Sequence, residues 1–227
     1  MEKFAIIVAG GAGVRMGGSI PKQFQLLKGK PVLWYSVKAF TEAFPDIQII
    51  IVIPAIYQAR SEAIINEFPK RNIKTTTGGD TRFDSVKNGL NCIGDKGIVF
   101  IHDAVRCLVT PKLIYQCYES AIEKGNAIPA VAATDTIRIE TTGGNKQIDR
   151  NSVRIIQTPQ TFYCKDIKAA FTQKYDPYFT DEASVIERKG VKINLIDGDA
   201  GNIKITRPVD SLIAEKILDE RRQQLFP

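Results

Sequence analysis

A glycine-rich segment near the start of the chain carries the residues that best predict its chemistry. Residues 10–18 read Gly-Gly-Ala-Gly-Val-Arg-Met-Gly-Gly and directly follow a short apolar run at residues 4–9. Because glycine has no Cβ, such a loop lets backbone N–H groups approach a polyphosphate closely. Arg15 and Lys22 add two cations at the same loop. A strand, an anion-binding loop and two flanking cations suggest an enzyme that handles a nucleoside triphosphate.

The glycine spacing by itself does not define the ligand. Gly11 and Gly13 are followed by Met16 where a dinucleotide-binding fingerprint has its third glycine, unless the pattern slides to Gly17 or Gly18. No Gly-Lys-Ser/Thr follows, so the loop is not of the Walker type. An ordinary strand-to-helix turn with surface cations is the alternative.

Short apolar runs typical of buried strands alternate with amphipathic segments along the chain. We expect strands at residues 4–9, 47–53, 98–101, 127–132 and 191–196, and helices at residues 32–44, 57–68, 82–92, 111–124 and 164–173. This alternation predicts an α/β fold with a Rossmann-like, mostly parallel sheet flanked by helices. Active groups in such a sheet lie at the carboxyl ends of the strands, where the glycine loop and the His102-Asp103 pair stand.

The segment 134–161 breaks this alternation. Ile137 and Ile139 alternate with polar residues, residues 141–145 are a turn signal, and residues 147–156 could form the return strand. We therefore expect an extended β-hairpin arm. Because an isolated two-stranded ribbon is barely stable in water, the arm is expected to pack on another subunit, with a flexible surface hairpin as the alternative.

Length and composition fit a soluble globular protein of 227 residues, which we expect to form a single domain over residues 1–227. The net charge of +6 fits acidic small substrates, and no block of consecutive Lys or Arg favours nucleic acid. The four cysteines lack C-x-x-C spacing and are expected to be free thiols of a reducing cytoplasm. The chain opens on Glu2 and Lys3 without a signal-peptide pattern, and no apolar run approaches the roughly 18 residues that span a membrane.

Six further motifs follow the glycine loop and its Pro-Lys-Gln (residues 21–23) in order. They occupy residues 78–90 (beginning Gly-Gly-Asp-Thr-Arg), 101–106 (Ile-His-Asp-Ala-Val-Arg), 135–137 (Asp-Thr-Ile), 149–150 with 157–160 (Asp-Arg and Gln-Thr-Pro-Gln), 180–184 (Thr-Asp-Glu-Ala-Ser) and 202–206 (Asn-Ile-Lys-Ile-Thr). Together with the loop they resemble the 2-C-methyl-D-erythritol 4-phosphate cytidylyltransferases of the non-mevalonate isoprenoid pathway over nearly the whole chain. Cys107, in place of a proline, and Arg138, in place of a frequent lysine, depart from the family pattern.

The resemblance implies a fold of the nucleotide-diphospho-sugar transferase type and a nucleotidyl transfer. A phosphate oxygen of the acceptor would attack the α-phosphorus of CTP, and pyrophosphate would leave. Because the nucleophile is already anionic, catalysis should rest on positioning and charge neutralisation. This requirement matches motifs made mostly of Arg, Lys, Asp and Gly.

The family pattern also implies roles for residues of this chain. The catalytic residues, which hold the triphosphate and stabilise charge on the α-phosphoryl group, would be Arg15, Lys22 and Lys204. The nucleotide would be bound by Gly11, Ala12, Gly13, Gly79, Asp80, Ser85 and Asp103. The acceptor, a polyol phosphate, would be bound by Arg106, Thr136, Arg150, Thr158, Thr180 and Lys204. Thr136 and Arg150 lie on the arm and would serve the neighbouring subunit of a homodimer.

Asp103 is the expected metal ligand. It follows a buried strand, where its carboxylate would meet Mg²⁺ or another divalent cation that bridges phosphates. The alternative role is a helix N-cap, which Asp also favours. His102 is the only histidine, so neither a zinc site nor a Ser-His-Asp triad is supported, and it is expected to be a packed or hydrogen-bonded neighbour of the site.

Three other functions are alternatives to this one. D-ribitol-5-phosphate cytidylyltransferases of teichoic acid synthesis share several of these motifs, but residues 149–150 and 180–184 favour the erythritol family. A non-catalytic nucleotide-binding protein would not need the intact cations Lys22 and Lys204. A dinucleotide-dependent dehydrogenase would require one uninterrupted Gly-x-Gly-x-x-Gly pattern and an acidic residue about 20 residues after it.

Overall fold

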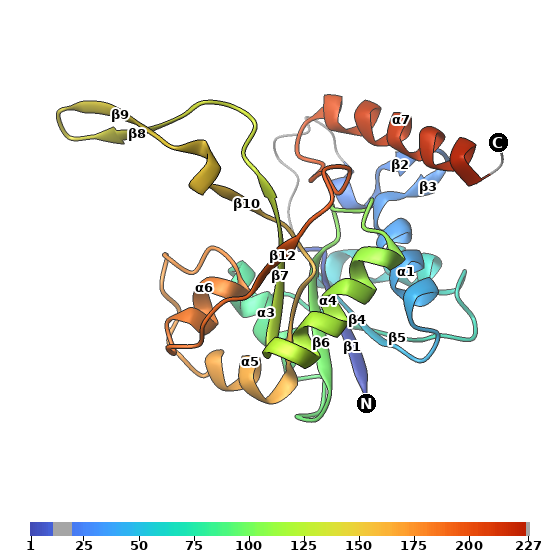
Figure 1. Cartoon of the computed structure of the whole chain (residues 1–227). Coiled ribbons are helices and arrows are strands. Elements are labelled where there is room, and N and C mark those ends of the chain that lie inside the picture. The colour runs from blue at the N-terminus through green and yellow to red at the C-terminus, as the bar shows by residue number, and fades with distance from the viewer. Residues whose placement is uncertain (11–19, 226–227) are drawn as a thin grey trace.

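A central eight-stranded sheet with helices on both faces forms the body of the molecule (Figure 1). The computed structural model describes residues 1–10 and 20–225. The strands of this sheet are β1 (Lys3–Val8), β4 (Gln48–Ile53), β5 (Asn72–Thr77), β6 (Ile98–Asp103), β7 (Asn126–Ala132), β10 (Arg154–Ile156), β11 (Gln160–Tyr163) and β12 (Leu195–Asp197). The α-helices are α1 (Val32–Ala43), α2 (Gln58–Ile65), α3 (Arg82–Leu90), α4 (Pro111–Lys124), α5 (Cys164–Ala170), α6 (Glu182–Glu187) and α7 (Pro208–Leu225).

The sheet is mixed but mostly parallel, as the sequence predicted. Strands β5, β4, β1 and β6 are neighbours and run parallel. Beyond them β11 runs antiparallel between β6 and β7, while β10 and β12 both pair with β7 at the far edge. Val8 lies opposite both Val52 and Asp103, so the carboxyl ends of β1, β4 and β6 meet at one edge. Ligands of open α/β sheets bind at this edge.

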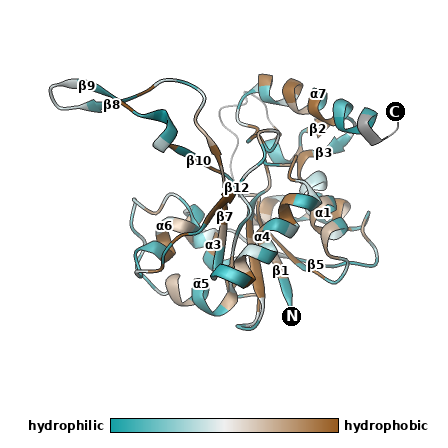
Figure 2. Ribbon diagram, in the orientation of Figure 1, coloured by the Kyte–Doolittle hydropathy of each residue, from teal (hydrophilic) through white to brown (hydrophobic). Residues whose placement is uncertain are grey.

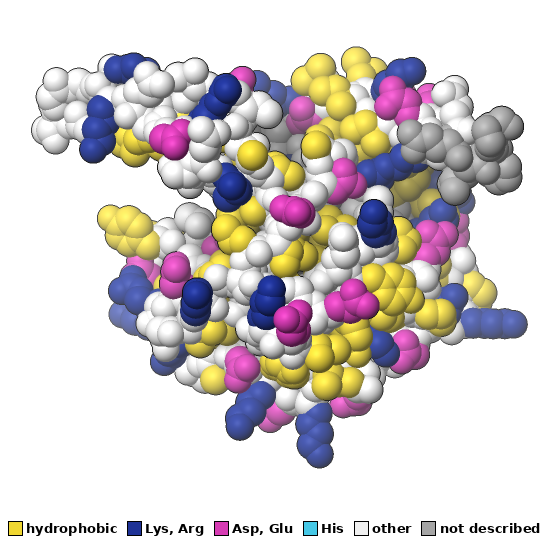
Figure 3. Space-filling model, in the orientation of Figure 1, with side chains coloured by type: hydrophobic (Ala, Val, Ile, Leu, Met, Phe, Trp, Pro, Cys, Tyr) yellow, Lys and Arg dark blue, Asp and Glu magenta, His cyan; other side chains and the backbone are white. Residues whose placement is uncertain are grey.

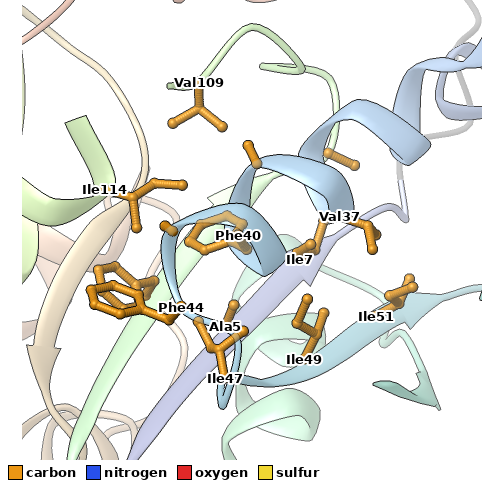
Figure 4. Packing of buried hydrophobic residues seen from close by; sticks show 14 of the residues in the cluster. Ala5, Ile7, Val37, Phe40, Phe44, Ile47, Ile49, Ile51, Val109 and Ile114 are labelled. Carbon is orange, nitrogen blue, oxygen red and sulfur yellow. The ribbon is translucent and has the colours of Figure 1, made fainter. Parts of the chain in front are cut away.

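Each face of the sheet has its own hydrophobic core. Residues that alternate along a strand point to opposite faces, so strands buried on both sides read as continuous apolar runs. On one face Ala5, Ile7, Ile49 and Ile51 pack against α1 and α4 (Figure 4). On the other face the alternate residues of the same strands pack against α3, α5 and α6. Figure 2 shows this concentration of hydrophobic residues in the central strands. No helix among residues 1–10 and 20–225 is long and apolar enough to cross a bilayer.

Some predicted elements were wrong or missing. Of the segment 191–196, only Leu195 and Ile196 pair in the sheet, because the Asn126 side chain binds the backbone of Lys192 and Asn194 in place of a strand partner. Strands β5 and β11 and helices α6 and α7 were not predicted, and the residues of β10 were assigned to the return strand of the arm instead of to the main sheet. β5 is a polar edge strand, and β10, β11 and α6 are too short to show a period. Residues 55–57 form a 3-10 turn before α2.

A two-stranded arm projects from the body (Figure 1). It consists of β8 (Ile137–Thr141) and β9 (Gly144–Ile148), paired antiparallel from Ile137 opposite Ile148 to Thr141 opposite Gly144. The expected range 134–161 is too long, because residues 154–156 and 160–161 belong to β10 and β11 of the main sheet. The return strand expected at 147–156 is also misplaced, since it starts at Gly144, whose φ of 140° favours glycine. Figure 3 shows the arm standing clear of a surface on which acidic and basic side chains are interspersed.

The four cysteines differ sharply in accessibility, which gives a testable prediction. All four are free thiols, and only Cys92 is exposed. Burial raises the pKa of Cys107, Cys117 and Cys164 to about 12, and the thiolate is the reactive form. The native protein should therefore react with one equivalent of a thiol reagent at pH 8 and with four equivalents in denaturant, as counted by intact mass. Rapid labelling of a second thiol in the native protein would contradict the packing around these side chains.

Candidate functional site

Three cations surround one carboxylate at the end of β6. Asp103 is the last residue of that strand and is almost fully buried. Lys204 Nζ lies 2.8 Å from Asp103 Oδ2, and Arg82 Nη2 lies 3.1 Å from Asp103 Oδ1. Arg106 Nε is 4.0 Å from Asp103 Oδ2. The cations come from α3, from the β6–α4 connection and from the segment before α7, so the fold assembles this cluster from three distant parts of the chain.

The surrounding charges keep Asp103 ionised. Burial alone would raise the pKa of this carboxyl group, but the positive charges of Arg82 and Lys204 outweigh burial and hold that pKa well below its usual range. Burial lowers the pKa of the neighbouring His102 to about 4, so its ring is neutral at pH 7. The three cations outnumber the carboxylate that they surround. Their excess positive charge can bind phosphate groups and stabilise negative charge that develops on them.

A chain of hydrogen bonds through His102 fixes the backbone at Asp103. When His102 Nε2–H donates to the Arg106 carbonyl oxygen at 3.2 Å, Nδ1 can accept from the Thr158 hydroxyl at 3.0 Å. The same hydroxyl oxygen accepts from the backbone N–H of Asp103 at 3.1 Å. His102 is thus a buried, hydrogen-bonded neighbour of Asp103, which is the role expected from the sequence.

The segment that carries Lys204 is bound to the β6–α4 connection. Arg106 Nη1 donates to the Asn202 carbonyl oxygen at 3.0 Å, and Asn202 Nδ2 donates to the Thr158 carbonyl oxygen at 2.9 Å. The Ile205 N–H donates to the Val105 carbonyl oxygen at 2.9 Å. The backbone on both sides of Lys204 is therefore fixed, while its side chain remains 45% exposed and can face a ligand.

Lys22 stands on the short 3-10 helix η2 (Lys22–Phe24) near the same segment. Its Nζ donates to the Thr206 carbonyl oxygen at 3.4 Å. The buried Gln23 side chain donates to the Ala9 carbonyl oxygen at 2.6 Å, which fixes η2 to the end of β1. The Pro-Lys-Gln and Asn-Ile-Lys motifs, at residues 21–23 and 202–204, therefore meet at the carboxyl edge of the sheet.

Gly79 and Ser85 lie together between the ends of β5 and β1. The Gly79 N–H donates to Ser85 Oγ at 3.1 Å, and Gly10 lies on the other side of the same hydroxyl. A Cβ on Gly79 would stand 2.4 Å from the Asp84 Cβ, so only glycine fits here. Thr81 and Asp84 close a capping box that starts α3. Asp80 is exposed at the rim of this turn.

The structure does not bring every expected residue to this cluster. Thr136, Arg150 and Thr180 are exposed, and Arg150 Nη1 donates to the Thr134 carbonyl oxygen at 2.7 Å, across the base of the arm. Gly11, Ala12, Gly13 and Arg15 lie outside the described residues. Of the residues expected from the sequence, the described site therefore contains Lys22, Gly79, Ser85, Asp103, Arg106, Thr158 and Lys204.

Sequence reasoning gave no site role to two charged residues. Arg82 binds Asp103 directly, and the buried Glu182 binds Arg82. Both stand inside motifs, Gly-Gly-Asp-Thr-Arg and Thr-Asp-Glu-Ala-Ser, which was the available signal. Their pairing joins positions 100 residues apart, and no local pattern reveals such a contact.

The donor set fits a divalent cation only in company with phosphate. Among the described residues no group of three or more His, Cys, Asp and Glu side chains could hold a metal alone. Mg²⁺ is often bound by one or two carboxylates, with substrate phosphates and waters completing its shell. Asp103 supplies such a carboxylate at an edge where cations would hold the phosphates.

Comparisons with known proteins agree with one another. A family model described as 2-C-methyl-D-erythritol 4-phosphate cytidylyltransferase matches residues 4–220. Curated proteins of that name from Bacteroides thetaiotaomicron and Phocaeicola vulgatus are 41% and 42% identical over 220 residues, which cover 96% of this chain and 100% of each relative. The structure of 4-diphosphocytidyl-2C-methyl-D-erythritol synthase from Anaerococcus prevotii superposes with a TM-score of 0.83 at 26% identity, covering 96% of both chains. The Francisella tularensis cytidylyltransferase is 31% identical with a TM-score of 0.78, covering 95% of this chain and 99% of its own.

Proposed function

The chain belongs to the 2-C-methyl-D-erythritol 4-phosphate cytidylyltransferase family, and from this premise we propose that the cluster around Asp103 is its active site. The protein is a nucleotidyltransferase that moves a cytidylyl group from CTP to 2-C-methyl-D-erythritol 4-phosphate in the non-mevalonate isoprenoid pathway. The products are 4-CDP-2-C-methyl-D-erythritol and pyrophosphate. The observation that carries the site assignment is the ring of Arg82, Arg106 and Lys204 around one buried carboxylate at the carboxyl edge of the sheet.

The reaction requires that two anions, the acceptor phosphate and CTP, bind next to each other. An oxygen of the acceptor phosphate attacks the α-phosphorus of CTP, a new P–O bond forms, and the bond to the β-phosphate breaks to release pyrophosphate. Lys22 contacts the Thr206 carbonyl oxygen and Lys204 contacts Asp103. In the proposed site their charges would lower the repulsion between the reactants and stabilise the charge on the α-phosphoryl oxygens. Arg106 is anchored by two backbone carbonyl groups, and in this proposal its charge would attract the acceptor phosphate.

The nucleotide base lies at the turn of Gly79 and Ser85. This turn sits at the end of β5, beside the end of β1, and presents backbone groups and a hydroxyl that can pair with the edge of cytosine. Asp103 would hold Mg²⁺ or another divalent cation together with the nucleotide phosphates. Such an ion, when bound, neutralises phosphate charge and orients the triphosphate.

Gly79→Ala tests the assignment of the base site. The new Cβ would overlap the Asp84 side chain, so the turn must shift, and we expect a loss of about 1–3 kcal/mol in stability together with weaker binding of CTP. Gly94→Ala is the matched control, since a Cβ there meets no atom within 4 Å. Calorimetric titration with CTP and thermal unfolding would measure both effects. Unchanged CTP affinity in a folded Gly79→Ala variant would remove this turn from the nucleotide site.

The arm completes the site of a second subunit. A hairpin that projects into solvent with Ile139 45% exposed, and whose base leaves Ile155 52% exposed, gains stability by packing on another chain. Thr136 and Arg150 would then reach the acceptor bound by the partner, so the active enzyme is a homodimer. The enzyme works in the cytoplasm, a location with which its four free thiols agree.

Pyrophosphate release tests the acceptor. The protein would be incubated with CTP and Mg²⁺, and either 2-C-methyl-D-erythritol 4-phosphate or D-ribitol 5-phosphate would be added in parallel wells. Release with the erythritol compound alone is expected. A preference for ribitol phosphate would mean that the reaction is the one proposed but that the acceptor differs. If the folded dimer released no pyrophosphate with either acceptor, the proposed site would be overturned.

A further inference from the structure

Glu182 is a buried charge for which the transfer reaction has no direct use. It is 1% exposed, stands at the first position of α6, and carries a carboxylate on the side facing α3. Both of its oxygens are bound by the guanidinium of Arg82: Nη1 contacts Oε1, and Nη2 lies 3.1 Å from Oε2. A buried carboxylate needs such a partner, and a bidentate pair of this kind fixes the geometry of both groups.

The same guanidinium also holds the carboxylate of the active site. Arg82 Nε and Nη2 lie 3.3 Å and 3.1 Å from Asp103 Oδ1. The second oxygen, Oδ2, is left for Lys204 at 2.8 Å. Arg82 therefore bridges two carboxylates, and its position between them decides which oxygen of Asp103 faces the phosphate side.

The start of α6, which carries Glu182, is fixed to the sheet. The Gln160 side chain donates to Asp181 Oδ2 at 2.8 Å, and its Oε1 accepts from the Ala183 N–H, also at 2.8 Å. Gln160 is buried on β11, opposite Ile101 of β6. The start of α6 is thus fixed to the strand next to the one that ends at Asp103, so Glu182 is a stable reference point for Arg82.

We propose that Glu182 is a positioning residue that acts through Arg82 on Asp103. By binding one side of the guanidinium, it limits Arg82 to one oxygen of Asp103 and balances part of its charge. Without that partner, Arg82 would move onto both oxygens of Asp103 and compete with Lys204, or turn toward the triphosphate. This inference rests on the proposed active site.

The variant Glu182→Gln tests the proposal, with Glu187→Gln as control. Glutamine keeps the shape and loses the charge, while Glu187 is an exposed carboxylate on the same helix. We expect kcat for Glu182→Gln to fall 10–100-fold, with KM for CTP and for the acceptor changed less than about threefold, because the base turn and the Thr180 loop stay in place. A collapse of α6 would instead raise KM for the acceptor. Activity of Glu182→Gln within twofold of Glu187→Gln would overturn the proposal.

A double-mutant cycle separates action through Arg82 from independent effects. In an Arg82→Gln background, adding Glu182→Gln should change kcat less than about threefold, because the bridge is already lost. An equal further loss in the double variant would mean that Glu182 acts independently, which contradicts the proposal. If Glu182→Gln alone leaves Arg82 unpaired and fails to fold, Arg82→Gln and the double variant can still be compared, and a difference in kcat of more than about threefold between them contradicts the proposal. Wild-type enzyme that releases no pyrophosphate would point to failure of the proposed function, whereas an active wild type with an additive cycle would reject only the role of Glu182.

Discussion

Lys22→Ala should abolish most of the transfer activity while leaving the fold intact. Lys22 lies on η2, which is fixed to the end of β1. In the proposed site it would act on charge that grows as the α-phosphoryl group is transferred. Removing one such group from a site that binds the transition state costs on the order of 10²–10³ in kcat, as the loss of an oxyanion donor does. The fold should survive because the Gln23 side chain fixes η2 to the end of β1.

Steady-state assays of pyrophosphate release would measure this loss. Lys38→Ala is the matched control, since Lys38 is a half-exposed lysine on α1 that pairs with Glu42 on the helix surface. The control should retain full activity, and both variants should unfold within a few degrees of the wild type. Normal turnover in folded Lys22→Ala would remove the Pro-Lys-Gln motif from the catalytic machinery.

The parts of the fold that the sequence predicted well are those with strong local signals. Helix α4 was predicted with its observed bounds, because Thr110 caps it, Pro111 begins it, and Gly125 ends it with a φ of 89°. Strands β1, β4 and β6 are continuous apolar runs because both of their faces are buried. β5 lacked this signal, since its Thr-rich sequence lies at an edge with one face partly in water.

The local sequence pattern predicted the arm but not where the arm ends. Its alternating pattern and turn residues predicted a hairpin, and the hairpin exists. Its end could not be located, because Arg154 and Ile156 pair with Ala132 and Ala130, and the hydrophobic pattern of a three-residue strand does not say which partner it takes.

The site shows the same division. Motif residues such as Asp103, Lys204 and Thr158 were chosen from the sequence, and the structure places all three in contact through side chains or through the backbone of Asp103. The bridge from Glu182 through Arg82 was not predicted. It depends on α6 lying against α3, a long-range contact that sequence spacing does not encode.

Mixing two inactive variants should restore activity if the arm serves the neighbouring subunit. Lys22→Ala breaks the body of a site, and Arg150→Ala breaks the arm. In a mixed dimer, the body with intact Lys22 meets the arm with intact Arg150, so one of the two sites is whole. Random exchange makes about half of the dimers mixed, so up to about a quarter of the wild-type activity should return.

The pairing of variants makes this result specific to sharing across an interface. Lys22→Ala mixed with Asp103→Asn should stay inactive, because both changes lie in the body and every site keeps one defect. If Arg150 instead served its own chain, the first mixture would also stay inactive although heterodimers were demonstrated by mass spectrometry. The Arg150 side chain donates to the Thr134 carbonyl oxygen at the base of an arm that leaves the body. In the proposed dimer this arginine serves the acceptor phosphate of the partner, so we expect activity to return in the first mixture alone.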